Sequence, residues 1–518
     1  MKHLVLAAAI GLLMMDSGTA DETGGASVVP PARPVVLDAG AILKKHGGDG
    51  DGWLLDNVPV FECPDGDIEE IYYYRWRAYR RNIHRHAAFG GWTVHEGGGY
   101  GITPCPLGHH IYEGRWLKNR VYLDDYCRFW LSGRDSPRRY STWFADACHA
   151  RYLVDWDSAQ AVSLLEGLQA NQAAWEKERF DAARGLFRWI PDRDGMEASL
   201  AGFEAGEADG FQWKTVIFGG EGYRPSLNSY MFADLRAIAA IASLAGDTEV
   251  AELHARKAEA LRAKVRQELW CPEKQFFLQR RGKDYGFVSG REEIGFFPWA
   301  FGLPEDKPEY AAAWRQLLDE QGFKAKYGPT TLERRSPYFM RPFAHHCLWN
   351  GPSWPYSTSV TLAALANLLN DYHQDVVTRD DYVALLRGYA VTQHDPDGRP
   401  MVREDHHPDE NRWLAKGVDY NHSRYCDLVI TGLVGLRPRA DDTLEINPLA
   451  PADWDYLCLD GVLYHGRSVT IVYDRTGSRY GRGAGLQILI DGVEAARSPT
   501  LRKITVEFQS RRPGPPAG

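Results

Sequence analysis

The chain has 518 residues, more than one hydrophobic core usually supports, so a large domain with a smaller appendage is expected. Its net charge is −9, and a mildly acidic chain without a basic cluster argues against nucleic acid as a partner. The aromatic content of 12% suits surfaces that stack on flat apolar ligands, although large cores also use aromatic residues.

The first twenty residues have the features of a leader. A short basic start is followed by the apolar run Leu4 to Met15, and small residues stand at Gly18 and Ala20. This pattern predicts a signal peptide over residues 1–20 and export to the periplasm or the exterior. The run is too short for a membrane span, and no later stretch approaches the ~20 apolar residues that one requires, so no membrane partner is expected. Residues 21–35 are rich in glycine and proline and predict a flexible linker.

Residues 36–436 are dominated by a helical period. Apolar residues recur at or near i, i+3, i+4 and i+7 in the segments 67–86, 157–178, 226–247, 248–269, 308–321, 357–373 and 379–393. Shorter helices near Tyr122, Trp143 and Asn421 bring the expected total to about ten. Long loops rich in glycine and aromatic residues separate them, as at 87–110 and 323–354. Loops of this length usually line a functional site, and a closed ring of helical hairpins would gather them at one end.

The pattern changes after Leu436 to an alternation of apolar and polar residues. Asp491-Gly492 and the segment 464–468 are typical turns of β-hairpins. The sequence therefore predicts a small antiparallel β domain over residues 437–518, with its last eight residues frayed.

An acidic stretch between two helices, residues 191–209, is predicted to have no regular structure. Its carboxylates are Asp192, Asp194, Glu197, Glu204, Glu207 and Asp209. A solvated acidic loop is one interpretation. The alternative rests on Met196 and Phe203, which would draw the loop inward. Burial beside apolar groups raises the pKa of a carboxyl group, which suits a proton donor.

A second acidic loop follows the last long helix. Glu404, Asp405 and Glu410 precede a helix expected to begin near Tyr420. The loop could lie on the surface, but Trp413, Tyr420 and His422 indicate the wall of a pocket.

The segment 345–359 presents aromatic residues just before a helix. Trp349, Trp354 and Tyr356 stand close to Asn350 and Gly351. Core packing would explain one of these rings, whereas three in eight residues favour a platform on which a sugar stacks.

Three of these segments resemble the signatures of a known group of enzymes. The motifs are DGMEAS at 194–199, LWNGPSW at 348–354 and VREDHHPDE at 402–410. They resemble those of the six-hairpin glycosidases related to glycoside hydrolase family 63, trehalase and mannosylglycerate hydrolase. The resemblance implies a mainly α fold, an (α/α)6 toroid with the β domain appended.

The same resemblance implies the site. The general acid falls on Glu197, where relatives usually have aspartate, and the general base on Glu404. Asn350 stands where relatives have arginine. The implied reaction inverts the anomeric carbon, for which the two carboxyl groups lie ~6.5–9.5 Å apart with a water between them. The expected substrate contacts are Trp349, Asn350, Trp354, Trp92, Tyr327, His109, Glu113 and Trp413.

The expected partner is an oligosaccharide or polysaccharide cleaved from its non-reducing end, with no cofactor. Which glycan is cleaved stays open, and three arginines in the loop 323–354 would tolerate an acidic one. A polysaccharide lyase or unsaturated uronyl hydrolase on the same toroid is one alternative, because fold alone does not decide chemistry. A non-catalytic glycan-binding protein is another.

Other chemistries find little support. His109 and Glu113 lie four residues apart, and histidine pairs occur at 345–346 and 406–407. Adjacent histidines cannot easily aim at one ion, so no metal is expected. Neither a phosphate-binding loop nor a GxSxG elbow is present in the sequence. The eight cysteines contain no CxxC pair, which leaves one or two disulfides open without indicating their pairing.

Overall fold

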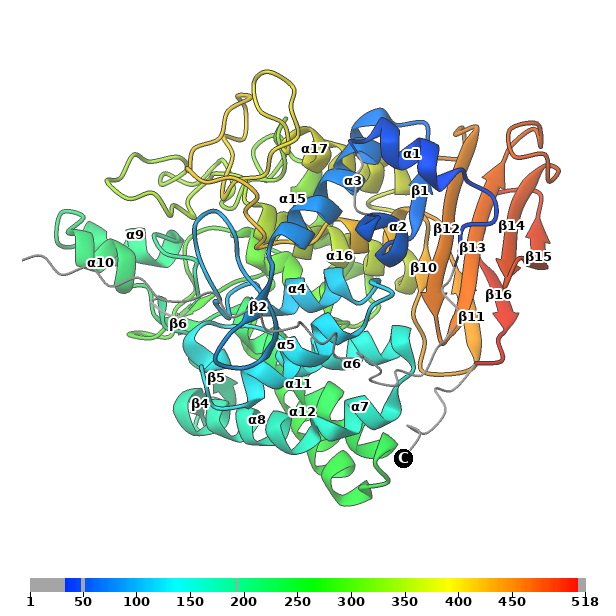
Figure 1. The fold of residues 1–518 in the computed structure, drawn as a ribbon. Coiled ribbons are helices and arrows are strands. Elements are labelled where there is room, and N and C mark those ends of the chain that lie inside the picture. Colours follow the sequence, from blue (N-terminus) through cyan, green and yellow to red (C-terminus); the bar gives the residue numbers. More distant parts are fainter. Residues whose placement is uncertain (1–32, 48–51, 192–193, 511–518) are drawn as a thin grey trace, which may run out of the picture.

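The computed structural model describes residues 33–47, 52–191 and 194–510. The predicted leader, nearly all of the predicted linker, Asp192 and the predicted frayed end lie outside this range. The α-helices all lie before residue 430, and the longer strands follow it (Figure 1). The helices are α1 (Ala39–Lys45), α2 (Trp53–Asn57), α3 (Gly66–Arg81), α4 (Leu107–Gly114), α5 (Val121–Leu131), α6 (Phe144–Asp155), α7 (Ser158–Ser163), α8 (Leu165–Arg179), α9 (Leu200–Glu207), α10 (Trp213–Phe218), α11 (Pro225–Leu244), α12 (Thr248–Leu269), α13 (Phe297–Ala300), α14 (Pro308–Ala311), α15 (Arg315–Leu318), α16 (Pro355–Asp371), α17 (Arg379–Val391) and α18 (Cys426–Leu428).

Local capping sets the boundaries of the longest helices. The Asp247 carboxylate accepts the backbone N–H of Val250 and starts α12. Thr378 and Asp381 form a reciprocal capping box at the start of α17. These side chains satisfy N–H groups that have no partner inside the helix. The periodic segments predicted from the sequence are helical apart from their ends, although 157–178 divides into α7 and α8 and 308–318 into short turns.

The helices close into a ring. Contacts run from α3 to α17, and then through α16, α13, α11 and α6 to α4. Helix α18 contacts both α4 and α3 and so completes the circuit. At the junction of the first and last long helices, Arg75 Nη1 donates to the Tyr389 hydroxyl (3.2 Å) and to Gln393 Oε1 (3.1 Å). This closure brings together loops that lie far apart in the chain.

Two local predictions were wrong. The stretch 191–209 contains a helix, α9, because its buried residues Leu200, Ala201 and Phe203 pack inward. The helix expected near Tyr420 begins only at Cys426. Its first N–H groups bind the buried Glu113 carboxylate, so a partner on another helix decides where it starts.

The C-terminal region is antiparallel, as the alternation predicted. One sheet has the order β1-β12-β13-β14-β15 and a second the order β10-β11-β16. The turns at 464–468 and 491–492 join neighbouring strands. The strands of these sheets are β1 (Val60–Glu62), β10 (Leu436–Arg437), β11 (Thr443–Ile446), β12 (Tyr456–Tyr464), β13 (Arg467–Asp474), β14 (Gly485–Ile490), β15 (Val493–Ser498) and β16 (Ile504–Glu507). Short two-stranded ribbons within the helical region are β2 (Ile83–His86) with β3 (Gly91–Val94), β4 (Phe180–Asp181) with β5 (Leu186–Phe187), β6 (Gly222–Tyr223) with β9 (Arg280–Arg281), and β7 (Trp270–Cys271) with β8 (Phe276–Phe277).

An N-terminal segment crosses into this sheet. Strand β1 forms its edge beside β12 (Figure 1). The buried Asp460 carboxylate also accepts the backbone N–H groups of Val35, Val36 and Leu37. Segments 35–37 and 60–62 therefore belong to the same β unit as the C-terminal strands. The predicted division between residues 36–436 and 437–518 stays a prediction.

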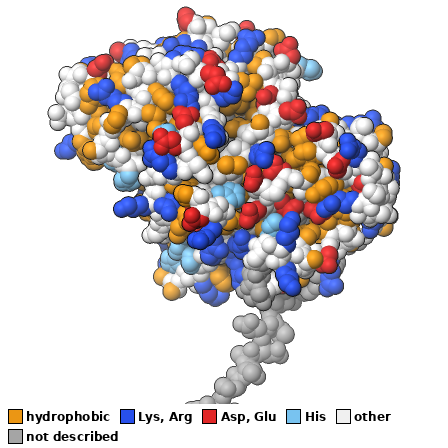
Figure 2. Space-filling view, turned by 90° about the horizontal axis from the view of Figure 1, so that it is seen from above, with side chains coloured by type: hydrophobic (Ala, Val, Ile, Leu, Met, Phe, Trp, Pro, Cys, Tyr) orange, Lys and Arg blue, Asp and Glu red, His pale blue; other side chains and the backbone are white. Residues whose placement is uncertain are grey.

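Basic and acidic side chains are interspersed over the face shown in Figure 2. Within the described part of the chain, no helix combines the length and apolar character needed to cross a bilayer.

Candidate active site

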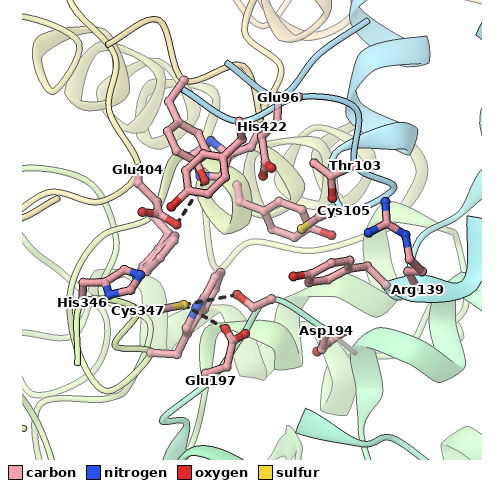
Figure 3. Close-up of a pocket in the computed structure, with 18 of the residues that line it drawn as sticks. Glu96, Thr103, Cys105, Arg139, Asp194, Glu197, His346, Cys347, Glu404 and His422 are labelled. Carbon is pink, nitrogen blue, oxygen red and sulfur yellow. Dashed lines mark hydrogen bonds between the residues drawn. The ribbon is translucent and has the colours of Figure 1, made fainter. Parts of the chain in front are cut away.

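The loops gathered by the ring enclose a cavity of 450 Å³ (Figure 3). Its volume lies in the ~300–1,000 Å³ range of small-molecule sites. Side chains reach it from five separate segments of the chain, namely 96–105, 139–140, 194–197, 345–356 and 404–422. Four carboxyl groups line it, those of Glu96, Asp194, Glu197 and Glu404.

Glu197 and Glu404, the two residues of the predicted acid–base pair, both line this cavity. In Figure 3 they approach it from different segments, with Glu96 on the side opposite Glu197. The two carboxyl groups are close enough to interact electrostatically, and the negative charge of Glu197 helps to raise the pKa of Glu404.

A tight loop presents Glu197 to the cavity. Gly195 has a φ of 68°, and a Cβ there would lie 3.0 Å from Cys105 Sγ. The Met196 side chain, between Gly195 and Glu197, is buried, which holds this part of the loop against the core. The Cys347 thiol lies 2.9 Å from Glu197 Oε2 and donates a hydrogen bond to it. Burial raises the pKa of this thiol well above its usual value, so it stays protonated and acts as a donor.

The base of this loop is fixed by an ion cluster. Arg224 is buried, with Nη1 3.3 Å from Asp194 Oδ2 and Nη2 3.0 Å from Glu292 Oε1. Its guanidinium lies over the Trp189 ring, 4.2 Å from the centroid. Burial raises the pKa of Asp194 in spite of this partner. Asp194 therefore holds the loop in place three residues before Glu197.

Glu404 is half-buried at the cavity. The Tyr420 hydroxyl donates to its Oε1 over 3.2 Å. Burial, opposed by this hydrogen bond and assisted by the charge of Glu197, raises the pKa of Glu404 to about 7. The next residue, Asp405, is buried away from the cavity, and its pKa is raised by burial and by the Glu404 charge.

Glu96 is a lining carboxylate that the sequence analysis did not select. It is 8% exposed, and burial followed by the charge of Glu404 raises its pKa to about 8. The only sequence signal was its place in HEGGGYG, a glycine-rich segment inside one of the long loops.

Two rings of the predicted sugar platform lie at the cavity. Trp349 and Trp354 line the cavity and stack on each other, with ring centroids 4.5 Å apart. Trp354 Nε1 donates to the Leu348 carbonyl over 2.9 Å. Both rings are almost fully buried, and one face of each is covered by the other ring. Tyr420 and His422 also line the cavity, as the interpretation of their loop as a pocket wall predicted.

Three residues predicted to contact substrate instead organise the surrounding loops and do not line this cavity. The Asn350 amide donates to the carbonyls of Tyr338 and Arg341, both at 3.0 Å. Tyr327 and Trp413 both pack against His406, with ring centroids 5.1 and 5.0 Å away.

Three more residues predicted to contact substrate also do not line the cavity, namely His109, Glu113 and Trp92. His109 is fully buried beneath it, against Tyr356 at 4.6 Å. Glu113 accepts three backbone N–H groups at the start of α18. Trp92 packs on Tyr122 in the ribbon β2–β3. Each was a polar or aromatic residue in a functional loop or motif, a pattern that does not distinguish a residue facing substrate from one that supports the loop.

Cations are scarce around the cavity. Arg139 lines it, with Nη2 2.7 Å from Asp135 Oδ2, and His345 and His346 stand at its rim. The three arginines that would tolerate an acidic glycan do not line the cavity. Arg334 pairs with Asp409, Arg335 with Asp319 and Glu333, and Arg341 covers the Phe211 ring.

The residues that the structure describes contain no cluster of three or more His, Cys, Asp or Glu arranged to hold a metal ion. All eight cysteines are buried as thiols.

Comparison with known proteins agrees with this arrangement. Residues 99–423 match the family described as mannosylglycerate hydrolase MGH1-like glycoside hydrolase domain, and residues 436–496 match the C-terminal domain of glycosyl hydrolase family 65. A solved structure described as a sialidase is 37% identical, with a TM-score of 0.81 over 92% of this chain. This chain spans only 43% of that protein.

More distant structures share the fold. A family 63 mannosylglycerate hydrolase from Thermus thermophilus is 14% identical, with a TM-score of 0.52 over 70% of this chain and 98% of its own. A family 78 rhamnosidase from a Bacillus species is 14% identical, with a TM-score of 0.55 over 83% of this chain and 41% of its own. The helical ring is thus that of the six-hairpin glycosidases. Since the family match covers more than half of its length, this chain belongs to the MGH1-like glycoside hydrolases.

Proposed function

We propose that this protein hydrolyses a terminal glycosidic bond with inversion, using Glu197 as general acid and Glu404 as general base. The observation that supports the proposal most strongly is that these carboxyl groups, far apart in the chain, line one cavity. Inverting hydrolysis needs one carboxylic acid at the leaving oxygen and one carboxylate that activates water on the opposite face of the sugar.

The hydrogen bonds around the pair suit these roles. Cys347 donates to Glu197 Oε2, which leaves Oε1 to carry the proton toward the leaving oxygen. Tyr420 donates to Glu404 Oε1, which leaves Oε2 to accept a proton from water. A base with a pKa of about 7 is about half ionised at neutral pH and is close to the optimum strength for proton transfer there.

The cavity supports action on chain ends. Beneath it, the Trp143 ring packs on Tyr230 (4.8 Å) and Tyr356 (6.2 Å). Tyr356 lines the cavity, and the other two rings are fully buried. This packing supports a pocket that receives the end of a glycan.

We further propose that the bound sugar is neutral. Glu96, Glu197 and Glu404 line the cavity without a salt bridge among the described residues, whereas its arginine, Arg139, is already paired with Asp135. A sugar carboxylate would add repulsion in a partly desolvated site. The activity named for the 37% identical relative, a sialidase, is therefore not assigned to this chain. That relative is also more than twice as long.

A glycan panel tests these points. Neutral oligosaccharides, sialosides and uronides are incubated with the protein, and the anomeric configuration of the first product is followed by NMR. We expect turnover of a neutral terminal sugar with inversion. A retained anomer would require a nucleophile in place of the base. Growth of ultraviolet absorbance would instead indicate a lyase, its loss an unsaturated uronyl hydrolase, and binding without turnover would leave only a glycan-binding role.

Export stays a proposal, since the predicted leader lies outside the described residues. Determining the N-terminus of the protein recovered from the periplasm or medium would test cleavage after Ala20. Retention of the intact chain in the cytoplasm would contradict it.

A further inference from the structure

A row of aromatic side chains runs from the catalytic cavity to helix α10. His345 and His346 line the cavity, and their rings stack with centroids 4.7 Å apart. The Trp213 ring lies 6.1 Å from that of His345, and the Phe218 ring lies 5.6 Å from that of Trp213. Trp213 and Phe218 are the first and last residues of α10, which projects from one side of the helical ring (Figure 1). The row therefore connects the cavity to the periphery of the molecule.

The two rings on α10 are open to solvent. Trp213 is 46% and Phe218 43% exposed. All 17 tryptophans lie in the described residues, and Trp213 is the one that is exposed. The same helix buries Val216 and Ile217, and a Cβ on Gly202 of α9 would lie 2.1 Å from the Val216 carbonyl oxygen. Helix α10 is thus packed tightly on α9 and presents its two aromatic rings outward.

This row begins beside the carboxyl group proposed as the general acid. The Cys347 thiol donates to Glu197 Oε2, and the backbone N–H of Cys347 donates to His345 Nδ1 over 3.0 Å. One residue therefore links Glu197 to the ring that contacts Trp213. A general acid protonates the leaving oxygen of the glycosidic bond. The leaving part of the glycan consequently lies on the side of the cavity from which the row extends.

The size and surroundings of the two rings fit a sugar chain. Aromatic rings offer large, rigid contact surfaces, and the exposed Gln212 and Lys214 beside them supply polar groups. Each ring contributes at most ~150–250 Å², well short of the ~800 Å² per partner that a stable protein interface buries. A ligand that needs separate stacking surfaces, continuous with the cavity, matches this strip better than a second protein does.

We propose that Trp213 and Phe218 form a binding strip for the leaving part of the glycan, so that the preferred substrate is an oligosaccharide or a longer chain. Each exposed ring stacks on a sugar of that part. Such contacts are equally strong in the ground state and the transition state, so they lower KM and leave kcat unchanged. The inference rests on the proposed function, because the role of Glu197 as acid decides on which side the leaving group lies.

Kinetics on substrates of different length test the strip. Wild type and Trp213→Ala are compared on a disaccharide and a hexasaccharide of the glycan that the panel identifies. We expect Trp213→Ala to raise KM for the hexasaccharide about 5-fold, the loss of one aromatic contact, with kcat unchanged. KM for the disaccharide should stay the same. Phe218→Ala should likewise affect only chains long enough to reach it.

The matched control is Phe180→Ala. Phe180 is 41% exposed and lies in the ribbon β4–β5, outside the cavity lining, so both KM values should equal those of wild type. Equal losses of Trp213→Ala on both substrates, or a lower kcat, would mean that Trp213 supports the fold, and would overturn the proposal. Sedimentation velocity gives a second check. A wild-type dimer that separates in Trp213→Ala would assign the strip to another copy of the chain and would also overturn it.

Binding is measured separately from turnover by acrylamide quenching of tryptophan fluorescence. Because Trp213 is the exposed indole, it should account for much of the quenching, and Trp213→Phe should remove that part. In the Glu197→Gln protein, the hexasaccharide should protect Trp213 from acrylamide, whereas the disaccharide should not. Absence of protection would overturn the proposal.

Failure of the proposed function would look different. If no glycan in the panel were turned over, the hydrolase assignment would fail. The quenching measurement would then use cellohexaose, maltohexaose and mannohexaose as probes on the wild-type protein. Protection of Trp213 by one of them would still show that the strip binds sugar chains, and absence of protection by all three would overturn the strip as well.

Discussion

The Cys347 thiol donates a hydrogen bond to Glu197 Oε2 across 2.9 Å. The two residues come from loops on different sides of the ring, one ahead of α9 and the other ahead of α16. The same sulfur lies 3.7 Å from the Gly195 carbonyl oxygen. A buried thiol thus ties the turn that presents Glu197 to the aromatic segment containing Trp349 and Trp354, and it engages one of the two carboxylate oxygens.

Removing this donor should reduce catalysis. We expect Cys347→Ala to lower kcat/KM about 5-fold, which corresponds to the ~1 kcal/mol of one hydrogen bond. Cys347→Ser keeps an O–H donor and should retain more activity than Cys347→Ala. Steady-state kinetics on the substrate found in the glycan panel measure both. Equal losses in the two variants, at unchanged thermal stability, would show that the thiol acts by packing alone.

Neutralising either member of the proposed catalytic pair should nearly abolish turnover. Glu197→Gln and Glu404→Gln keep the size of the side chain but can neither lose nor gain the catalytic proton. Each should lower kcat by at least ~10²-fold, the lower range of general acid–base contributions. The matched control is Glu204→Gln, on the helix that follows Glu197 and outside the catalytic cavity. A variant of Glu197 or Glu404 with wild-type kcat would remove that residue from its role.

The rate should depend on the ionisation of Glu404. A general base works in its charged form, so kcat/KM should fall as the pH drops below about 7, the pKa of this residue. The hydrogen bond from Tyr420 lowers that pKa. Its removal in Tyr420→Phe should therefore move the acidic limb of the pH profile to higher pH. A limb that stays in place or moves to lower pH would mean that another group titrates there.

A buried carboxyl group outside the site should limit stability in alkaline solution. Glu293 is 1% exposed and accepts a hydrogen bond from Thr361 in α16. Burial raises its pKa to about 8. Because the folded-state pKa lies above the unfolded value, wild-type stability is lost as the pH rises toward and through 8.

Glu293→Gln cannot ionise and should be more stable than the wild type at about pH 9, by on the order of 1–3 kcal/mol, with a smaller difference at about pH 5. Thermal unfolding at the two pH values measures this. The exposed Glu309→Gln serves as control and should show no such dependence. A difference for Glu293→Gln that does not grow with pH would contradict the burial argument.

Glu113 should affect folding and leave the chemistry intact. Its carboxylate accepts the N–H groups of Tyr425, Cys426 and Asp427 at 2.9 to 3.1 Å. Glu113→Ala leaves these buried donors unpaired, which should lower the free energy of unfolding by about 2–4 kcal/mol. Denaturant titration measures the loss. KM for the glycan, determined on the folded fraction, should be unchanged, and a large rise would return Glu113 to the substrate contacts predicted from the sequence.

The sequence alone determined the elements whose cause is local. The helical period of 248–269 gives the bounds of α12, and the alternation after Leu436 gives the strands of the β sheets. Short motifs also singled out Glu197 and Glu404, since the residue types and their neighbours are visible in the chain. Their presence in one cavity was expected from the resemblance to ring-shaped glycosidases.

Only the tertiary structure decided which polar residues face that cavity. Glu96 and Cys347 acquire their surroundings when the ring closes and brings distant loops to Glu404 and Glu197. Asn350 and Glu113 have side chains suited to binding sugars, yet their hydrogen bonds are taken up by backbone groups of neighbouring segments. Burial, charge and hydrogen-bond partners depend on residues remote in the chain, and a one-dimensional pattern does not contain those distances.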